Sequence, residues 1–381
     1  MAGARNIFEE VEGNATETRK AVAPGMIDKG GAGGARRAIR AWLIVLGALV
    51  VTMILVGGLT RLTDSGLSIT EWDLVMGSLP PMGPADWQAA FAKYQETPEF
   101  RLVNPSMTLE DFKAIYWWEW GHRFLGRITG LVWIAGFLGI LAAKKIPTGW
   151  NGRLLTIGVL IGVQGAVGWW MVHSGLQGEM TDVASYRLAT HLGLAFVILG
   201  LIAWAVMLLG RREAELMQAR RLRDRSLFGM GTGLMHLALV QILLGALVAG
   251  IDAGRGFTDW PLMAGQVFPP DAFYIEPLWR NFFENSGLVQ FVHRVVGYLL
   301  ALFAIGAMIR GRKSGAAATR TAFLLAGAMV LLQMVLGIVT VLNAATLHIA
   351  ITHQLGAIFA WLLILNARFH AGYPQPQSIR G

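Results

Sequence analysis

The segment that most constrains the fold runs from Thr321 to Ala367, where 47 consecutive residues include no Asp, Glu, Lys or Arg. A membrane-spanning helix needs about 20 predominantly apolar residues. The segment is therefore long enough for two such helices, and the turn-like residues 343–346 divide it near its middle. A chain with this segment is expected to be an integral membrane protein.

The rest of the chain has the same character. Of its 381 residues, 54% are hydrophobic and only 15% are charged, whereas soluble domains have about 25% charged residues. The absence of cysteine excludes disulfides, iron–sulfur clusters and thiolate metal ligands. We predict an all-α integral membrane protein. Its eight transmembrane helices are expected near residues 41–60, 122–143, 154–173, 188–209, 227–250, 290–309, 321–342 and 348–367.

The distribution of basic residues predicts the orientation. With the N-terminus in the cytoplasm, the cytoplasmic segments hold 22 of the 32 Lys and Arg residues but only 8 of the 24 Asp and Glu residues. Because loops rich in Lys and Arg resist translocation, we expect both termini in the cytoplasm. The net charge of +8 then reflects topology. We therefore expect the lipid bilayer, and no nucleic acid, as a partner.

An internal repeat divides the chain. Residues 62–77 resemble residues 250–265, and three further matches follow in the same order in both halves. Each half contributes four helices, an even number, so the halves should share one orientation in the membrane, as in a parallel repeat. The further matches pair His122 with His293, Gln164 with Gln333, and His191 with His353.

The repeat predicts two fused four-helix bundles. The predicted parts are a disordered cytoplasmic tail (1–40), an N-terminal bundle (41–210), a basic cytoplasmic linker (211–226), a C-terminal bundle (227–370) and a C-terminal tail (371–381).

Four repeat-matched histidines are expected in the first turns of even-numbered helices, at one depth near the outer face. Each precedes a Gly or Ala by four residues, and positions i and i+4 share a helix face, so flat space is left beside the imidazole. Imidazole pairs on facing helices are the usual axial ligands of b-type haem. Zinc is less well supported, because neither bundle has Cys or an evident third ligand. A single such histidine is more often a hydrogen-bonded interior residue. The four are His122, His191, His293 and His353.

Charged residues flank these histidines. Glu119 lies three residues before His122, whereas the second half has Gln290 at the corresponding position. A carboxylate there is interpreted as a base or electrostatic stabiliser over one macrocycle, and the alternative is a carboxylate that only supports a ligand. The difference indicates that one bundle reacts and the other only carries haem. Candidates for pairing with haem propionates, with lipid headgroups as an equal alternative, are Arg123, Arg127, Arg187 and Arg294.

With these motifs, residues 41–370 closely resemble the haem A synthase family, in its proteobacterial and mitochondrial form. The specific marks are the sequence GLTRLTDSGLSITEW at residues 58–72, the spacing Glu119-x-x-His122-Arg123, and the paired helices with the other three histidines.

The resemblance implies that His122 and His191 hold the substrate haem O, with Glu119 near its reacting edge. It implies that His293 and His353 hold a haem b as cofactor. In this family the C8 methyl of haem O is oxidised through a hydroxymethyl group to the formyl group of haem A, which serves cytochrome oxidase.

The resemblance also implies a bacterial inner-membrane location, with the haem sites toward the outer face. The partners that it suggests are haem O synthase, cytochrome oxidase assembly factors, an unidentified electron acceptor and further copies of the chain.

Two other function classes stay open from the residues alone. A di-haem b-type electron carrier, such as a quinol-linked cytochrome b, would use both bundles equivalently. A transporter with parallel repeats is less well supported, because no charged pathway crosses the middle of the membrane.

Overall fold

Helices make up the framework of the protein. The computed structural model describes residues 32–72, 77, 79–176 and 178–375. In these ranges no β-strand forms, and eight helices are long and apolar enough to cross a membrane, as predicted. They are α1 (Ala32–Leu62), α4 (Leu109–Ala142), α5 (Asn151–Gly175), α6 (Ser185–Leu209), α8 (Arg225–Gly250), α11 (Ser286–Arg312), α12 (Ala317–Leu342) and α13 (Leu347–Gly372).

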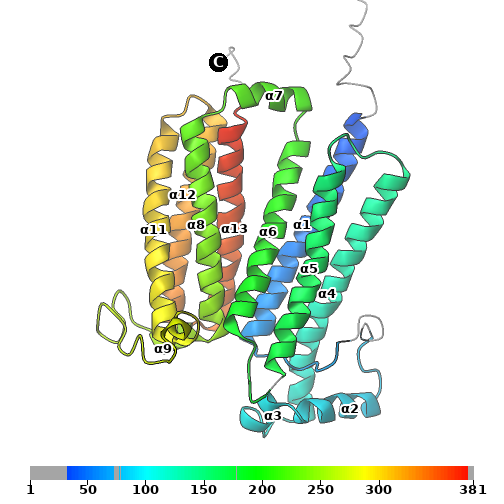
Figure 1. The fold of residues 1–381 in the computed structure, drawn as a ribbon, viewed down its shortest axis with the longest axis vertical. Coiled ribbons are helices and arrows are strands. Elements are labelled where there is room, and N and C mark those ends of the chain that lie inside the picture. Colours follow the sequence, from blue (N-terminus) through cyan, green and yellow to red (C-terminus); the bar gives the residue numbers. More distant parts are fainter. Residues whose placement is uncertain (1–31, 73–76, 78, 177, 376–381) are drawn as a thin grey trace, which may run out of the picture.

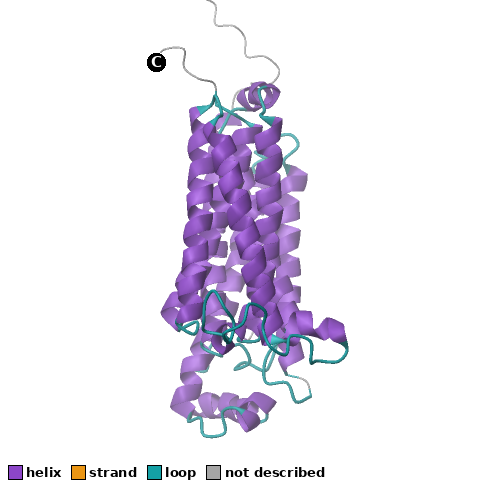
Figure 2. Ribbon diagram, turned by 90° about the vertical axis from the view of Figure 1, so that its left-hand side faces the viewer, coloured by secondary structure: helices purple, strands orange, loops and turns teal. Residues whose placement is uncertain are grey.

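The long helices run side by side in two groups of four (Figures 1 and 2). One half contains α1, α4, α5 and α6, and the other contains α8, α11, α12 and α13 (Figure 1). In the first half, α4 and α6 each pack against both α1 and α5; in the second, α11 and α13 each pack against both α8 and α12. The histidine-bearing helices thus occupy opposite corners of each group.

The two halves meet along α1 and α6 on one side and α8 and α13 on the other. Trp361 of α13 packs against Phe196 of α6, with ring centroids 6.3 Å apart. A Cβ atom at Gly200 would lie 3.1 Å from the Trp361 ring, so the missing side chain makes room for it. The interface also contains a polar contact, in which the Gln354 amide donates to the carbonyl oxygen of Ile54 at 2.6 Å.

The outward faces of the long helices are apolar. Leu131, Val159 and Leu302 are each more than 60% exposed in the isolated chain. Exposed aliphatic side chains at mid-helix positions would be unfavourable in water, but they match the hydrocarbon interior of a bilayer. This surface and the eight spans make the chain a multi-pass membrane protein.

We call the end of the molecule that carries α2, α3 and α9 the cap end, and the opposite end, where α7 and the last turn of α13 lie, the tail end (Figure 1). In the first half, α2 (Pro84–Gln95) and α3 (Pro98–Leu102) form the cap. Their Tyr94 packs against Phe112 and Tyr116 near the start of α4, and all three aromatic side chains are buried.

The cap changes the position of one histidine within its helix. α4 begins at Leu109, where the Thr108 hydroxyl accepts a hydrogen bond from the Asp111 amide. The expected position of His122 in the first turns of its helix is therefore wrong, since it lies 13 residues after the first one. The N-cap and the aromatic cluster stabilise α4 beyond the apolar segment. The other three histidines lie within two turns of their helix starts.

An ion-pair cluster connects the halves at the cap end. The Arg61 guanidinium contacts the carboxylate of Asp64 at 2.7 Å and that of Asp252, in the second half, at 2.8 Å. Both aspartates adopt the left-handed backbone conformation, with φ near 50°. The second cap continues with α9 (Ala253–Gly256), η2 (Leu278–Arg280) and α10 (Asn281–Glu284).

At the tail end, one predicted boundary needs correction. Residues 32–40, expected in the tail, belong to α1, where Arg36 donates to the carbonyl oxygens of Leu208 and Arg211. Residues 1–31 and 376–381 lie outside the described part. The predicted linker 211–226 contains α7 (Glu213–Arg221), a helix with acidic residues in its first turn and basic residues in its last, as the helix dipole favours.

Candidate functional site

The four predicted histidines form two facing pairs. In the first half, the imidazole of His122 on α4 faces that of His191 on α6, with ring centroids 6.5 Å apart. In the second half, His293 on α11 and His353 on α13 lie close enough to interact electrostatically. The pairing predicted from the repeat order therefore agrees with the positions of the side chains.

A glycine of a neighbouring helix contacts each imidazole. A Cβ atom added to any of these glycines would lie 2.9–3.1 Å from the Cε1 atom of the histidine, which is closer than ordinary packing allows. Only a residue without a side chain lets the ring approach the helix backbone this closely. The pairs are Gly57 with His122, Gly168 with His191, Gly245 with His293, and Gly337 with His353.

Glutamine amides contact three of the four imidazoles. The amide nitrogen of Gln164 lies 3.2 Å from Nδ1 of His191 and donates to the backbone oxygen of that histidine. Two further amides, both 3.1 Å from Nδ1 and both with the same second bond to the histidine backbone, are Gln241 at His293 and Gln333 at His353. The Gln241 amide nitrogen also lies 3.3 Å from Nε2 of His293. Each glutamine precedes the contacting glycine by four residues.

This geometry fits a metal macrocycle better than a small metal ion. Two metal–imidazole bonds of about 2 Å, together with the distance from each nitrogen to its ring centre, span about 6 Å, close to the 6.5 Å between His122 and His191. Among the described residues, no three His, Cys, Asp or Glu side chains cluster as a metal site would require. Two axial imidazoles with a planar group between them suit haem iron.

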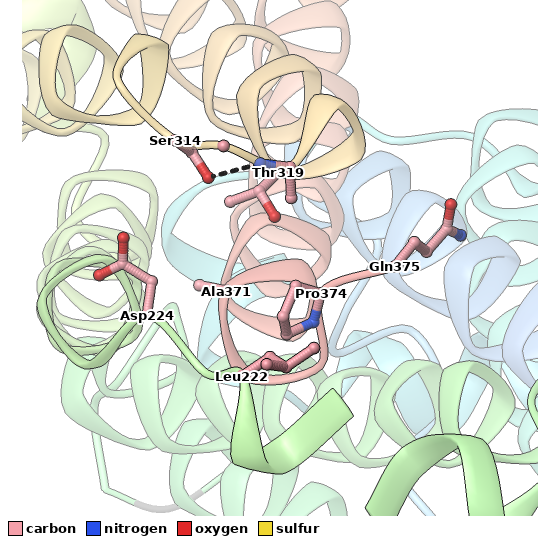
Figure 3. Close-up of a pocket in the computed structure, with 9 residues that line it drawn as sticks. Leu222, Asp224, Ser314, Thr319, Ala371, Pro374 and Gln375 are labelled. Carbon is pink, nitrogen blue, oxygen red and sulfur yellow. Dashed lines mark hydrogen bonds between the residues drawn. The ribbon is translucent and has the colours of Figure 1, made fainter. Parts of the chain in front are cut away.

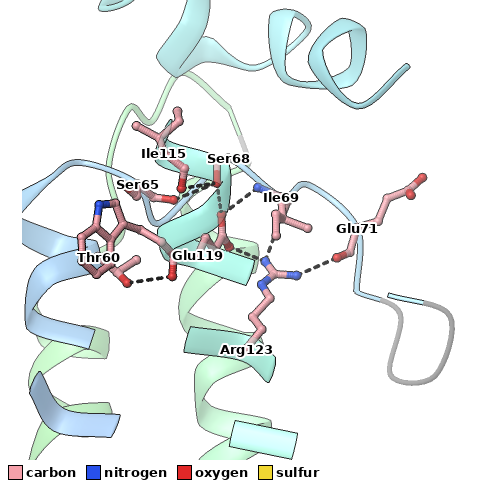
Figure 4. A network of polar contacts seen from close by, with 9 residues as sticks. Thr60, Ser65, Ser68, Ile69, Glu71, Ile115, Glu119 and Arg123 are labelled. Carbon is pink, nitrogen blue, oxygen red and sulfur yellow. Dashed lines mark hydrogen bonds and ion pairs between the residues drawn. The ribbon is translucent and has the colours of Figure 1, made fainter. Parts of the chain in front are cut away.

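The Glu119 carboxylate lies one turn before His122 and is only 3% exposed. Figure 4 shows that it points toward the segment that follows α1. One carboxylate oxygen accepts hydrogen bonds from the Ser68 hydroxyl and the Ile69 amide, both at 2.7 Å. The other accepts from Arg123 at 2.6 Å. These three bonds, one of them charge-assisted, hold the carboxylate in a single position.

Gln290 occupies the corresponding place in the second half and makes a weaker set of contacts. Its amide nitrogen donates to the backbone oxygen of Phe257 at 3.1 Å, and its amide oxygen accepts from Arg294 at 3.3 Å. Glu119 and Gln290 are both buried. The two halves therefore share the position and differ in its charge.

Two of the four predicted arginines, Arg123 and Arg294, bind backbone oxygens of the loops at the cap end. Arg123 donates to the backbone oxygens of Ile69 and Glu71, and Arg294 donates to those of Phe257, Asp259 and Leu262. Arg187 donates to the Trp170 carbonyl oxygen and lies 4.4 Å from the centre of the Trp170 ring. Arg127 follows Arg123 by one turn on α4. These contacts leave the propionate role of the four arginines a prediction.

The cavity shown in Figure 3 lies away from the histidines. Its volume is about 410 Å³, and it is located at the tail end, between the start of α8, the loop from α11 to α12, and the end of α13. None of its lining residues is a predicted site residue. They are Leu222, Asp224, Ser314, Gly315, Ala316, Thr319, Ala371, Pro374 and Gln375.

Some site residues escaped the sequence prediction. Gln164 and Gln333 were matched as repeat positions, but no contact with histidine was inferred, and Gln241, Gly57 and Gly245 were not identified. The signal for the glutamines and for Gly245 is the spacing Gln-x3-Gly, which recurs on the helices that precede three of the four histidine helices. Ser68 and Ile69, which bind Glu119, have no such signal.

The chain is similar to known proteins over its whole length. A model of the cytochrome oxidase assembly protein family (COX15-CtaA) matches residues 40–365. The heme A synthase of Ruegeria pomeroyi is 64% identical over 383 residues, covering all of both chains. That of Paracoccus denitrificans is 58% identical over 377 residues, covering 99% of this chain and 98% of its own. The chain therefore belongs to the cytochrome oxidase assembly family that includes these heme A synthases.

Proposed function

We propose that the protein is a haem A synthase, which oxidises the C8 methyl group of haem O to a formyl group through a hydroxymethyl intermediate. The observation that carries this proposal is the inequality of two otherwise similar histidine pairs. Glu119 places a fixed, buried carboxylate one turn from His122, and Gln290 replaces it beside His293. A di-haem electron carrier would not need this difference.

The chemistry assigns a task to Glu119. In the first oxidation, the methyl group and water give a hydroxymethyl group, two protons and two electrons. In the second oxidation, the hydroxymethyl group and another water give a hydrated aldehyde, two protons and two electrons. The hydrated aldehyde then loses water to leave the formyl group. A carboxylate held by Ser68, Ile69 and Arg123 is preorganised to stabilise positive charge at the oxidised carbon or to accept a proton from the attacking water.

The two histidine pairs then have different occupants. His122 and His191 bind the iron of the substrate haem O, and His293 and His353 bind a haem b as cofactor. When bound, the haem b supplies one-electron redox chemistry. The electrons finally leave to an acceptor outside this chain.

The corresponding contacts in the two halves support a repeat of two bundles, 41–210 and 227–370. Arg123 and Arg294, each next to its histidine, donate to backbone oxygens in the matching blocks 62–77 and 250–265. The basic segments lie at the tail end, so the positive-inside rule assigns that end to the cytoplasm and the haem sites to the outer side of a bacterial inner membrane. The candidate propionate partners are Arg123, Arg127, Arg187 and Arg294.

Haem O is hydrophobic and must be supplied within the membrane, so haem O synthase is a proposed partner. Cytochrome oxidase assembly factors, which would receive haem A, are another. Association with further copies of the chain belongs to the same proposal.

Extraction of pigments after co-expression with haem O synthase tests the function. The wild-type chain should produce hydroxymethyl and formyl haem, identified by chromatography and mass spectrometry. Glu119→Gln, which gives the first half the amide of the second, should lower haem A formation about 100-fold or more while the haem b spectrum is kept. Glu110→Gln, an exposed change on the same helix, is the matched control.

Two results would contradict the proposal. If the wild-type chain yields neither product, the enzymatic function is wrong and the di-haem carrier is favoured. If Glu119→Gln forms haem A at the wild-type rate, the function stands but Glu119 has no catalytic role.

A further inference from the structure

One of the four imidazoles lacks the glutamine that contacts the other three. Nδ1 of His122 is buried and has no hydrogen-bond partner within the described part of the chain. Nδ1 of His191, His293 and His353 each lies 3.1–3.2 Å from a glutamine amide. The exception, His122, is one of the two ligands proposed for the substrate haem. Both ligands proposed for haem b, the resident haem, have a glutamine contact.

Met53 stands where the missing glutamine would be. Met53 precedes the contacting Gly57 by four residues, as Gln241 precedes Gly245. The positions also correspond in space. A Cβ atom on Gly126, four residues after His122, would lie 3.6 Å from Cε of Met53, and one on Gly297, four residues after His293, would lie 3.1 Å from Nε2 of Gln241.

The exchange of glutamine for methionine removes a hydrogen bond from the imidazole. A carboxamide has a donor and an acceptor, whereas a thioether sulfur is only a weak acceptor. The amide oxygens of Gln164, Gln241 and Gln333 are buried without another partner. A histidine that binds iron through Nε2 carries a proton on Nδ1, and the amide oxygen accepts that proton when the carboxamide turns over. The thioether of Met53 can accept it only weakly.

When the ring nitrogen that does not bind the metal donates a hydrogen bond, that bond fixes the ring and raises its basicity. Loss of the bond commonly lowers metal affinity about 10–100-fold. In the orientation seen in the structure, the amide nitrogen bonds the backbone oxygen of the same histidine, which keeps the carboxamide next to the ring. His191, His293 and His353 are therefore held as firm ligands. His122 packs against Gly57 but lacks this hydrogen bond within the described part of the chain.

We propose that Met53 makes His122 the exchangeable axial ligand, so that haem O enters and haem A leaves by making and breaking the bond to His122 while His191 stays in place. The inference rests on the proposed function, because it assigns the first pair to the substrate. It makes Met53 a positioning residue. Gln241 and Gln333, which hold both ligands of the resident haem, explain why that haem stays.

The test measures haem loss from purified protein loaded with haem O and haem b, using apomyoglobin as the acceptor. The wild-type protein should release haem O in a fast phase and haem b in a slow phase. Met53→Gln should slow the fast phase about 10-fold or more and lower the reduction potential of the haem O iron, because a more basic ligand favours the ferric form. Met53→Leu, which fills similar space without a hydrogen bond, should keep the fast phase.

The reciprocal change supplies the second arm. Gln241→Met should speed the loss of haem b about 10-fold or more and raise its potential, with the fast phase unchanged. The inference fails if Met53→Gln and Gln241→Met leave both rates and both potentials at wild-type values although two haems are bound. A wild-type protein whose first pair binds no haem contradicts both the inference and the proposed function, so the two failures are distinguishable.

Discussion

Both halves of the molecule place two imidazoles against glycines of neighbouring helices, but the residues around the imidazoles differ. The second half has an amide beside His293 in Gln290 and another in Gln241. The first half has a carboxylate and a thioether at the corresponding positions, Glu119 and Met53. In the proposed function, these two differences separate a site that holds its haem from a site that changes it.

In this molecule, the residues that set the common geometry are not the residues that set the chemistry of each half. The glycines that receive the rings recur in all four places, because the close approach of ring and backbone is needed wherever a histidine faces its partner. The residues that differ are those that set charge and hydrogen bonding next to the ring.

The largest expected effect comes from removing one histidine of each pair in cells that lack haem O synthase. In such cells only the second pair should be filled, so His353→Ala should lose the haem b spectrum while His191→Ala keeps it. Visible absorption of the purified variants, at equal protein concentration, makes the measurement. If both variants lose the spectrum equally, or neither does, the assignment of separate occupants to the two halves is wrong.

A smaller effect is expected in the first cap, which has a buried acid with no counterpart in the second half. Burial raises the pKa of the Glu99 carboxyl from 4.5 to about 8, and the nearby charge of Asp182 adds to the shift. Oε2 of Glu99 is buried without a hydrogen-bond partner. Since the folded pKa lies above the unfolded one, the stabilising contribution is full below about pH 4.5 and is lost as the pH rises through about 8.

Glu99→Gln should therefore stabilise the cap at neutral and higher pH, by on the order of a few kcal/mol, and remove the decline in stability between pH 5 and 8. Hydrogen exchange of the α2 and α3 amides across that range measures it. Glu96→Gln, an exposed change nearby, should follow the wild-type profile. A wild-type cap whose protection stays constant or rises from pH 5 to 8 would refute the prediction.

The smallest effect concerns the ion pair that joins the halves. Asp252→Asn removes the charge that Arg61 contacts across the interface and keeps a residue type that tolerates the left-handed conformation. Because the pair is partly exposed, the loss should be about 0.5–1 kcal/mol, seen as a small decrease in the thermal unfolding temperature in detergent. Asp64→Asn, which removes the partner on the same side, should have a smaller effect. Equal decreases in the unfolding temperature of the two variants would show that the contact between the halves stabilises the protein no more than the contact within the first half.

Much of the fold could be predicted because apolar length is a direct signal. The uncharged segment from Thr321 to Ala367 requires two spans, and α12 and α13 lie there. The start of α4 was missed because residues 109–121 mix charged and aromatic side chains. Their helix depends on contacts with Tyr94 and the rest of the cap, which are distant in sequence.

The histidine pairing could be predicted because four residues of one type recur in matched positions. The partners of Glu119 could not, since the Ser68 hydroxyl and the Ile69 amide reach it only through the path of the chain after α1. Gln241 belongs to the recurring spacing Gln-x3-Gly, but that spacing alone does not show which side chain the amide contacts. Its role becomes visible only when the histidine is seen beside it.

The amide contact between Gln354 and Ile54 has a consequence for how the two sites communicate. Gln354 follows His353 directly, and Ile54 follows Met53, so the bond joins the side chain next to a proposed cofactor ligand to the backbone next to Met53. α1 thus connects the two histidine pairs mechanically. A shift of α1 that loosened His122 would also pull on α13, which carries His353, so the occupancy of one site would affect the other.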